Sequence, residues 1–111
     1  MGLDSMWKEP GSDEPGYVDG RFDVCGGLFA DNGNDSFRGK VYNGIFKDAT
    51  GISLYEDLTN QQCRDVIPKL QEYNLRRSVN NYYGVKDEEW SEFIRMWIAH
   101  SEAGHWLWAF Y

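Results

Sequence analysis

Apolar residues recur at helical spacing in two segments of the chain. Between Cys63 and Tyr73 they fall every three or four positions, and the same spacing runs from Trp90 to Ile98. Such spacing places the apolar side chains on one face of an amphipathic helix. Pro68 lies inside the first segment and has no backbone N–H to donate, which predicts a kink or a helix in two pieces. The pattern therefore predicts two helices, over about residues 60–77 and 88–103.

The residues around these segments carry helix start and stop signals. Thr59 and Gln62 have the spacing of a capping box, in which each side chain accepts a hydrogen bond from the backbone N–H of the other residue. Leu58 and Cys63 flank this start as a hydrophobic staple. Acidic residues gather where the second helix begins, and Gly104 stands just past its expected end.

The last seven residues, 105–111, alternate as a β-strand does and are apolar on both sides. Side chains at alternate positions point to the same face, which groups Trp106, Trp108 and Phe110 on one side. The other face receives His105, Leu107, Ala109 and Tyr111. Either this is a central strand with a cover on both faces, or one aromatic face stays open for an interface or a ligand.

Asn-Gly pairs predict turns in the first half of the chain. Asn32-Gly33 stands between extended segments, and Asn43-Gly44 offers a second turn of the same kind. Both residue types tolerate the positive φ of the tight turns that join hairpin strands. Together with the helices, this predicts an α+β fold. Its small antiparallel sheet contains hairpins around these turns and the strand 105–111, and both helices pack on one face.

The first twenty residues differ in composition from the remainder. They combine glycine, two of the three prolines and several acids with few apolar residues. This composition predicts a flexible acidic N-terminal arm over residues 1–20, followed by a single α+β domain over 21–111. Trp7 is the exception within the arm, and the sequence leaves open whether it docks into a groove or stays partly exposed.

Charge and hydropathy exclude several classes of protein. The net charge is −7, and residues 1–35 hold eight acidic side chains against two basic ones. A nucleic-acid binder needs clustered Lys and Arg, so we expect no nucleic-acid partner. The longest apolar run, Trp106 to Tyr111, is far too short to span a membrane. No signal-peptide pattern begins the chain, and Cys25 and Cys63 are expected to be free thiols, which together indicate a cytoplasmic protein.

His100, Glu102 and His105 are the residues closest to a chemical motif. Their spacing, H-x-E-x-x-H, has metal-ligand residue types but does not place both histidines on one helical face. Because Gly104 is expected to end the helix between them, the two rings should diverge. We therefore expect no metal, no cofactor and no catalytic residues, and the sequence favours a role other than catalysis.

The aromatic excess is the strongest functional signal. Aromatic residues make up 16% of the chain, and Trp and Tyr are enriched in binding hot spots. The sequence favours a small binding module that acts through a protein partner or as a homo-oligomer. The expected binding residues are Trp106, Trp108, Phe110, Tyr111, His105 and His100. An alternative is a protein for a small apolar ligand, or a small enzyme, with an apolar pocket between sheet and helices. A weaker alternative is an acidic inhibitor that mimics nucleic acid.

Overall fold

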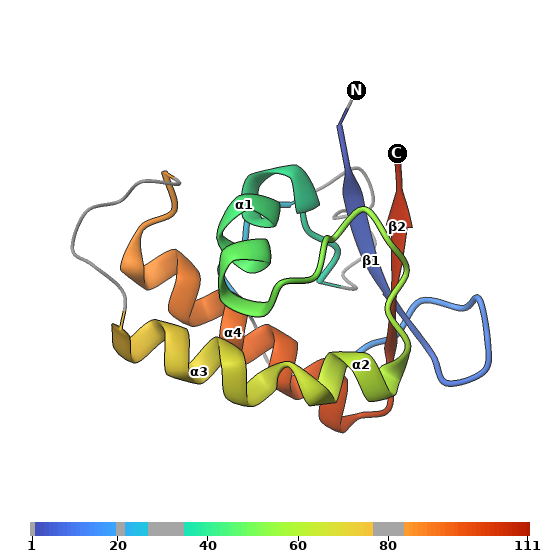
Figure 1. Cartoon of the computed structure of the whole chain (residues 1–111). Helices are drawn as coiled ribbons and strands as arrows, with labels where there is room; N and C mark the ends of the chain where they lie inside the picture. The colour runs from blue at the N-terminus through green and yellow to red at the C-terminus, as the bar shows by residue number, and fades with distance from the viewer. Residues whose placement is uncertain (1, 20–21, 27–34, 77–83) are drawn as a thin grey trace.

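The chain folds as a small α+β unit with a two-stranded antiparallel sheet beside packed helices (Figure 1). The computed structural model describes residues 2–19, 22–26, 35–76 and 84–111. The elements are β1 (Asp4–Lys8), α1 (Gly39–Thr50), α2 (Asn60–Asp65), α3 (Ile67–Arg76), α4 (Asp87–Glu102) and β2 (Trp106–Phe110). The two strands come from opposite ends of the chain and lie side by side.

The sheet is held at both outer edges as well as at its centre. β1 and β2 pair antiparallel, with Trp7 opposite Leu107. On the free edge of β1, Ser5 and Phe37 exchange two backbone hydrogen bonds of 2.9 and 3.0 Å. On the free edge of β2, Leu58 and Leu107 exchange two of 3.0 Å. An isolated two-stranded sheet is marginal in water, so these bridges and the buried inner face keep the strand pair in place.

The N-terminal residues differ from the flexible arm that composition suggested. Residues 4–8 form β1, and Trp7 is completely buried. Its indole Nε1–H points at the sulfur of Met96, 3.2 Å away, and its ring meets the ring of Trp97 edge-on. A buried Trp side chain removes a large apolar area from water. This one contribution therefore offsets much of the cost of ordering a segment that has few other apolar residues.

The two predicted helical regions are present, and the first is divided as Pro68 requires. The break falls at Val66, and Pro68 is the second residue of α3, where a backbone N–H would have no partner within the helix. The capping box is formed: Thr59 Oγ1 accepts from the Gln62 N–H at 3.2 Å, and Gln62 Oε1 accepts from the Thr59 N–H at 2.9 Å. α4 and β2 also fall close to their predicted bounds.

The hairpin predicted at Asn43-Gly44 is wrong, because both residues lie inside α1. The Asn43 side chain accepts a hydrogen bond from the Leu54 N–H at 2.8 Å, which gives the residue a structural role in a helix. Tyr42, Ile45 and Phe46 are all buried, and their spacing is that of a helical face. The hairpin predicted around Asn32-Gly33 lies outside the described residues.

Aromatic side chains dominate the core between the sheet and the helices. The largest fully buried side chains include Trp7, Trp90, Trp97, Tyr42, Phe37, Phe46 and Phe93. Phe93 of α4 stacks on Tyr42 of α1 with ring centroids 4.6 Å apart, so the two helices are joined through their aromatic faces. In the described part of the chain, no helix is long and apolar enough to cross a membrane.

Candidate functional site

The outer face of β2 is aromatic and only partly covered. Leu107 points inward and is fully buried, whereas Trp106 and Trp108, on the opposite face, are half-buried. Phe110 is 43% exposed and Tyr111 is 63% exposed. The structure therefore keeps the predicted alternation, and it leaves aromatic surface accessible along the strand.

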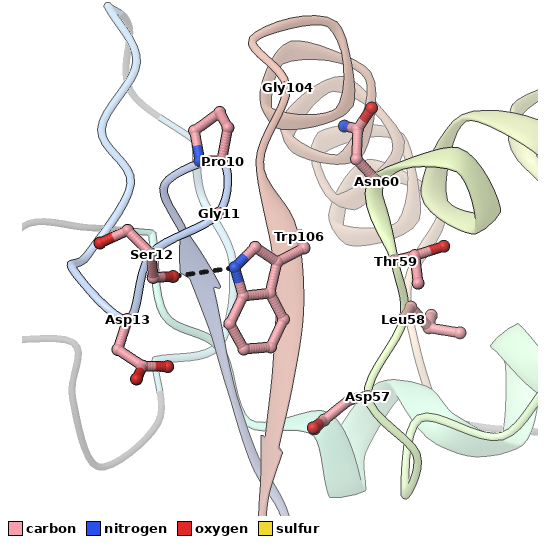
Figure 2. Close-up of a pocket in the computed structure, with 10 residues that line it drawn as sticks. All are labelled: Pro10, Gly11, Ser12, Asp13, Asp57, Leu58, Thr59, Asn60, Gly104 and Trp106. Carbon is pink, nitrogen blue, oxygen red and sulfur yellow. Dashed lines mark hydrogen bonds between the residues drawn. The ribbon is translucent and has the colours of Figure 1, made fainter.

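A groove of ≈ 780 Å³ lies over Trp106 (Figure 2). One wall is the turn Pro10–Asp13, and the other is the segment Asp57–Asn60 that leads into α2. The Trp106 indole stands between these walls, and its Nε1–H donates to the backbone oxygen of Ser12 at 2.9 Å. The turn from the start of the chain thus covers one end of the aromatic face but leaves the groove open beside it.

A second hollow of ≈ 490 Å³ continues along β2 toward its end. It is lined by Tyr55, Glu56, Asp57, Trp108, Ala109, Phe110 and Tyr111. Asp57 borders both hollows, and its carboxylate also accepts from the Ala109 N–H at 2.8 Å. In the described residues, the charged side chains lining the two hollows are Asp13, Glu56 and Asp57, which are all acidic.

A cation of the protein itself already rests on this face. The Lys8 ammonium lies 4.2 Å from the ring centroid of Trp108 and 5.7 Å from that of Trp106. It is also 3.7 Å from the Asp13 carboxylate. Such distances are those of cation–π contacts, which the electron-rich face of an indole favours. The indoles of β2 therefore present their faces in a way that suits a positive charge.

The two histidine rings converge, which corrects the prediction that they diverge. His100 Nδ1 and His105 Nδ1 are 2.7 Å apart, and both residues are buried. Gly104, at φ +88°, turns the chain back at the end of α4. The His105 N–H then donates to the His100 oxygen, and the Gly104 N–H donates to the Ser101 oxygen. This is the Schellman arrangement, in which the residues on either side of the turn bring their side chains together.

A carboxylate stands at each end of the histidine pair. His100 Nε2 is 2.6 Å from Asp35 Oδ2, and His105 Nε2 is 3.8 Å from Glu9 Oε2. Asp35 has a positive φ of 57°, a conformation that Asp adopts more readily than most residues. The four groups thus form one row, Asp35–His100–His105–Glu9, from a mostly covered carboxylate to a half-exposed one.

The surroundings of the pair are tightly packed. The Trp7 ring stacks on His100, nearly parallel, with centroids 4.9 Å apart. Gly16 lies so close to the His105 ring that an added Cβ would stand 2.8 Å from it. Burial lowers the pKa of His105, the neighbouring His100 lowers this pKa further, and Glu9 raises it. The two histidine rings are therefore enclosed by their neighbours, with a carboxylate at each end of the pair.

The two cysteines differ in exposure, since Cys25 is exposed and Cys63 is buried. Cys25 and Cys63 are both free, as predicted. Burial raises the pKa of Cys63 to about 12, so its thiol is neutral at physiological pH. Among the described residues, no group of three or more His, Cys, Asp and Glu side chains is placed to hold a metal ion.

Sequence reasoning identified the aromatic face but missed the groups that surround it. Asp13 and Asp57 come from loops, and no periodic pattern marks a loop residue that will meet a strand. Asp35 and Glu9 reach the histidines only through the fold. The convergence of His100 and His105 did have a signal, because they flank the predicted turn at Gly104 in the positions that the Schellman arrangement brings into contact.

Comparison of the chain with protein-family models, with curated proteins and with solved structures gave no match.

Proposed function

We propose that this protein is a binding module whose outer β2 face receives a basic, extended segment of a protein partner. One observation carries the proposal: the two hollows along Trp106, Trp108 and Phe110 are lined by aromatic rings and by acidic charges. Aromatic rings supply the apolar contact area of binding hot spots. Carboxylates beside them favour Lys or Arg over acidic side chains.

The position of the Lys8 side chain supports the choice of a cationic partner. Its ammonium lies on the Trp108 face with Asp13 beside it, so the protein shows internally the kind of contact we propose for the partner. Arg stacks on indole at least as well as Lys does, and its planar group also pairs with carboxylates. The net charge of −7 adds a long-range attraction for such a segment.

The shape of the site favours an extended segment over a compact ligand. The two hollows follow β2 in succession and share Asp57, so an occupant can lie along the strand across both. The space between the sheet and the helices, which a pocket for a small apolar ligand would need, is instead filled by Trp7, Trp97 and Phe37.

Selection from a library of random short peptides tests the proposal. We expect the retained peptides to be enriched in Lys or Arg next to apolar residues, and their binding to weaken with salt because exposed ion pairs are screened. Phe110→Ser should lower the affinity of such a peptide by about tenfold, the loss expected for one exposed aromatic contact. Tyr17→Ala is the matched control, since Tyr17 is 53% exposed but lines neither hollow.

Three outcomes would overturn the proposal. Retained peptides could lack basic residues, or they could bind Phe110→Ser and the unchanged protein equally well. Sedimentation could also show that the aromatic face is occupied by a second copy of the chain, in which case Phe110→Ser would convert a dimer to a monomer.

A further inference from the structure

The distance between the two histidines limits how many protons they can hold. At 2.7 Å between the Nδ1 atoms, one hydrogen lies between them, because two N–H groups pointing at each other cannot approach so closely. His100 Nε2 needs its own hydrogen to donate to Asp35 at 2.6 Å. The neutral pair therefore has one nitrogen without hydrogen at its outer end, His105 Nε2, which faces Glu9.

A proton taken up by the pair must consequently bind at His105 Nε2. At present this nitrogen lies 3.8 Å from the Glu9 carboxylate, which is longer than a hydrogen bond. Protonation turns His105 Nε2 into a hydrogen-bond donor on a positively charged ring. The charged ring then attracts the Glu9 carboxylate, and the two form a charge-assisted hydrogen bond. A second added proton has no site, since the nitrogens that face each other already share one.

Glu9 begins the turn that forms one wall of the groove. The Glu9 N–H donates to the Glu14 oxygen at 2.8 Å, and the Ser12 N–H donates to the Glu9 oxygen at 3.1 Å. Ser12 in turn accepts from the Trp106 indole at 2.9 Å. The backbone of Glu9 is thus linked through hydrogen bonds to Ser12 and, through Ser12, to the aromatic ring in the groove.

We propose that Asp35, His100, His105 and Glu9 form a one-proton switch that sets the position of the Pro10–Asp13 wall over Trp106. Protonation draws Glu9 to His105 and holds the wall against the end of α4, and deprotonation releases it. The geometry of these four residues supports the switch independently of the proposed function. Only the use of the switch in regulating partner binding rests on that function.

The surroundings of the pair contribute few other charges. β1 presents the uncharged Trp7 ring, and the segment after β1 presents Gly16. From α2, the Asn60 amide donates to the His105 backbone oxygen. Lys8 of β1 directs its ammonium to Trp108, on the outer face of the sheet. In the described part of the chain, the charged groups in contact with the two rings are thus Asp35 and Glu9.

Nuclear magnetic resonance of the protein without any partner tests the switch. The nitrogen shifts of the two rings report proton uptake, and the Trp106 indole N–H reports the position of Ser12. On lowering the pH, we expect the folded protein to gain one proton, at His105 Nε2, and the Trp106 signal to shift with the same midpoint. In Glu9→Gln, the Trp106 signal should stay fixed over the pH range in which His105 of that variant takes up its proton. Glu14→Gln, a change of an exposed acid in the same turn, should retain it.

Each contrary result has a distinct meaning. If the two histidine rings of the folded protein take up two protons, or take up none before the protein unfolds, the pair does not hold one added proton and the switch is overturned. A Trp106 signal that stays fixed, or that shifts equally in Glu9→Gln, would overturn the mechanical link, since a field effect of the ring charge alone persists in that variant. None of these results bears on peptide selection, so failure of the switch and failure of the proposed function are separable.

Discussion

At the scale of single residues, the close approach of Gly16 to His105 is the most restrictive contact of the site. The His105 ring is buried against Gly16 on one side and stands 2.7 Å from His100 on another. A ring held in this way cannot move aside without breaking its contact with His100. Glycine is required at position 16 because it lacks a Cβ.

Gly16→Ala should therefore destabilise the protein. The added Cβ would stand 2.8 Å from three ring atoms of His105, and overpacking of a tight site costs about 1–3 kcal/mol. Urea unfolding of the variant measures this change. Gly2→Ala is the matched control, because its Cβ would meet nothing within 4 Å, and it should leave the unfolding midpoint unchanged. Equal midpoints for both variants would show that the His105 ring is not fixed.

At the scale of secondary-structure elements, the start of α2 is the feature that local sequence specifies most completely. Thr59 and Gln62 exchange both hydrogen bonds of the capping box. Leu58 just before the cap bridges to β2, so the same few residues begin a helix and hold the edge of the sheet. This short connection also forms a wall of the groove.

Thr59→Ala should lower the free energy of unfolding by about 1 kcal/mol, the usual cost of losing an N-cap side chain. Gln62→Ala removes the reciprocal bond, and a double-mutant cycle with Thr59→Ala measures how far the two depend on each other. Because both bonds fix the same turn, the double variant should lose less than the sum of the single losses. Strict additivity would mean that the two bonds act independently.

The extent to which sequence predicts this fold depends on how local each signal is. The capping box, the break near Pro68 and the core stripe of α4 each rest on residues within one or two helical turns, and all three are present. The prediction of a turn at Asn43-Gly44 was wrong because Tyr42, Ile45 and Phe46 are buried on one helical face, with Tyr42 and Phe46 packed against α4, and this burial outweighs the preference of a single Asn-Gly pair. β1 was missed for a related reason, since its partner strand lies at the other end of the chain.

The candidate site could likewise be predicted only where its signal is local in the sequence. The alternation of Trp106, Trp108 and Phe110 is local and was predictable. The acidic lining from Asp13 and Asp57, and the carboxylates beside the histidines, depend on contacts between distant segments. No pattern in a single sequence reports such contacts.

At the scale of the whole molecule, the burial of His105 makes stability depend on pH. In the unfolded chain each histidine has a pKa of about 6.5, whereas burial lowers the pKa of His105 in the folded state. As the pH falls below about 6.5, the unfolded chain binds more protons than the folded protein, so the equilibrium moves toward unfolding. The stability associated with His105 is thus fully present above this range and is lost as the pH decreases.

Urea unfolding between about pH 7.5 and 5.5, above the range in which most carboxylates titrate, measures this effect. We expect the free energy of unfolding to decrease with decreasing pH, by at most about 1.4 kcal/mol per pH unit for each proton of difference. A constant or increasing free energy of unfolding over this interval would contradict the burial of a neutral His105.

The pairing of β1 with β2 also has a consequence for how the protein is made. β1 precedes its partner strand by about a hundred residues in the chain, a separation that makes loop closure slow. Until β2 is synthesised, Met6 and Trp7 lack their cross-strand partners Trp108 and Leu107. The helices can assemble during synthesis, but the sheet closes only after translation has passed Phe110. A nascent chain that stalls in α4 lacks β2 and therefore leaves one edge of β1 unpaired, and unpaired strand edges of this kind make a chain a target for chaperones.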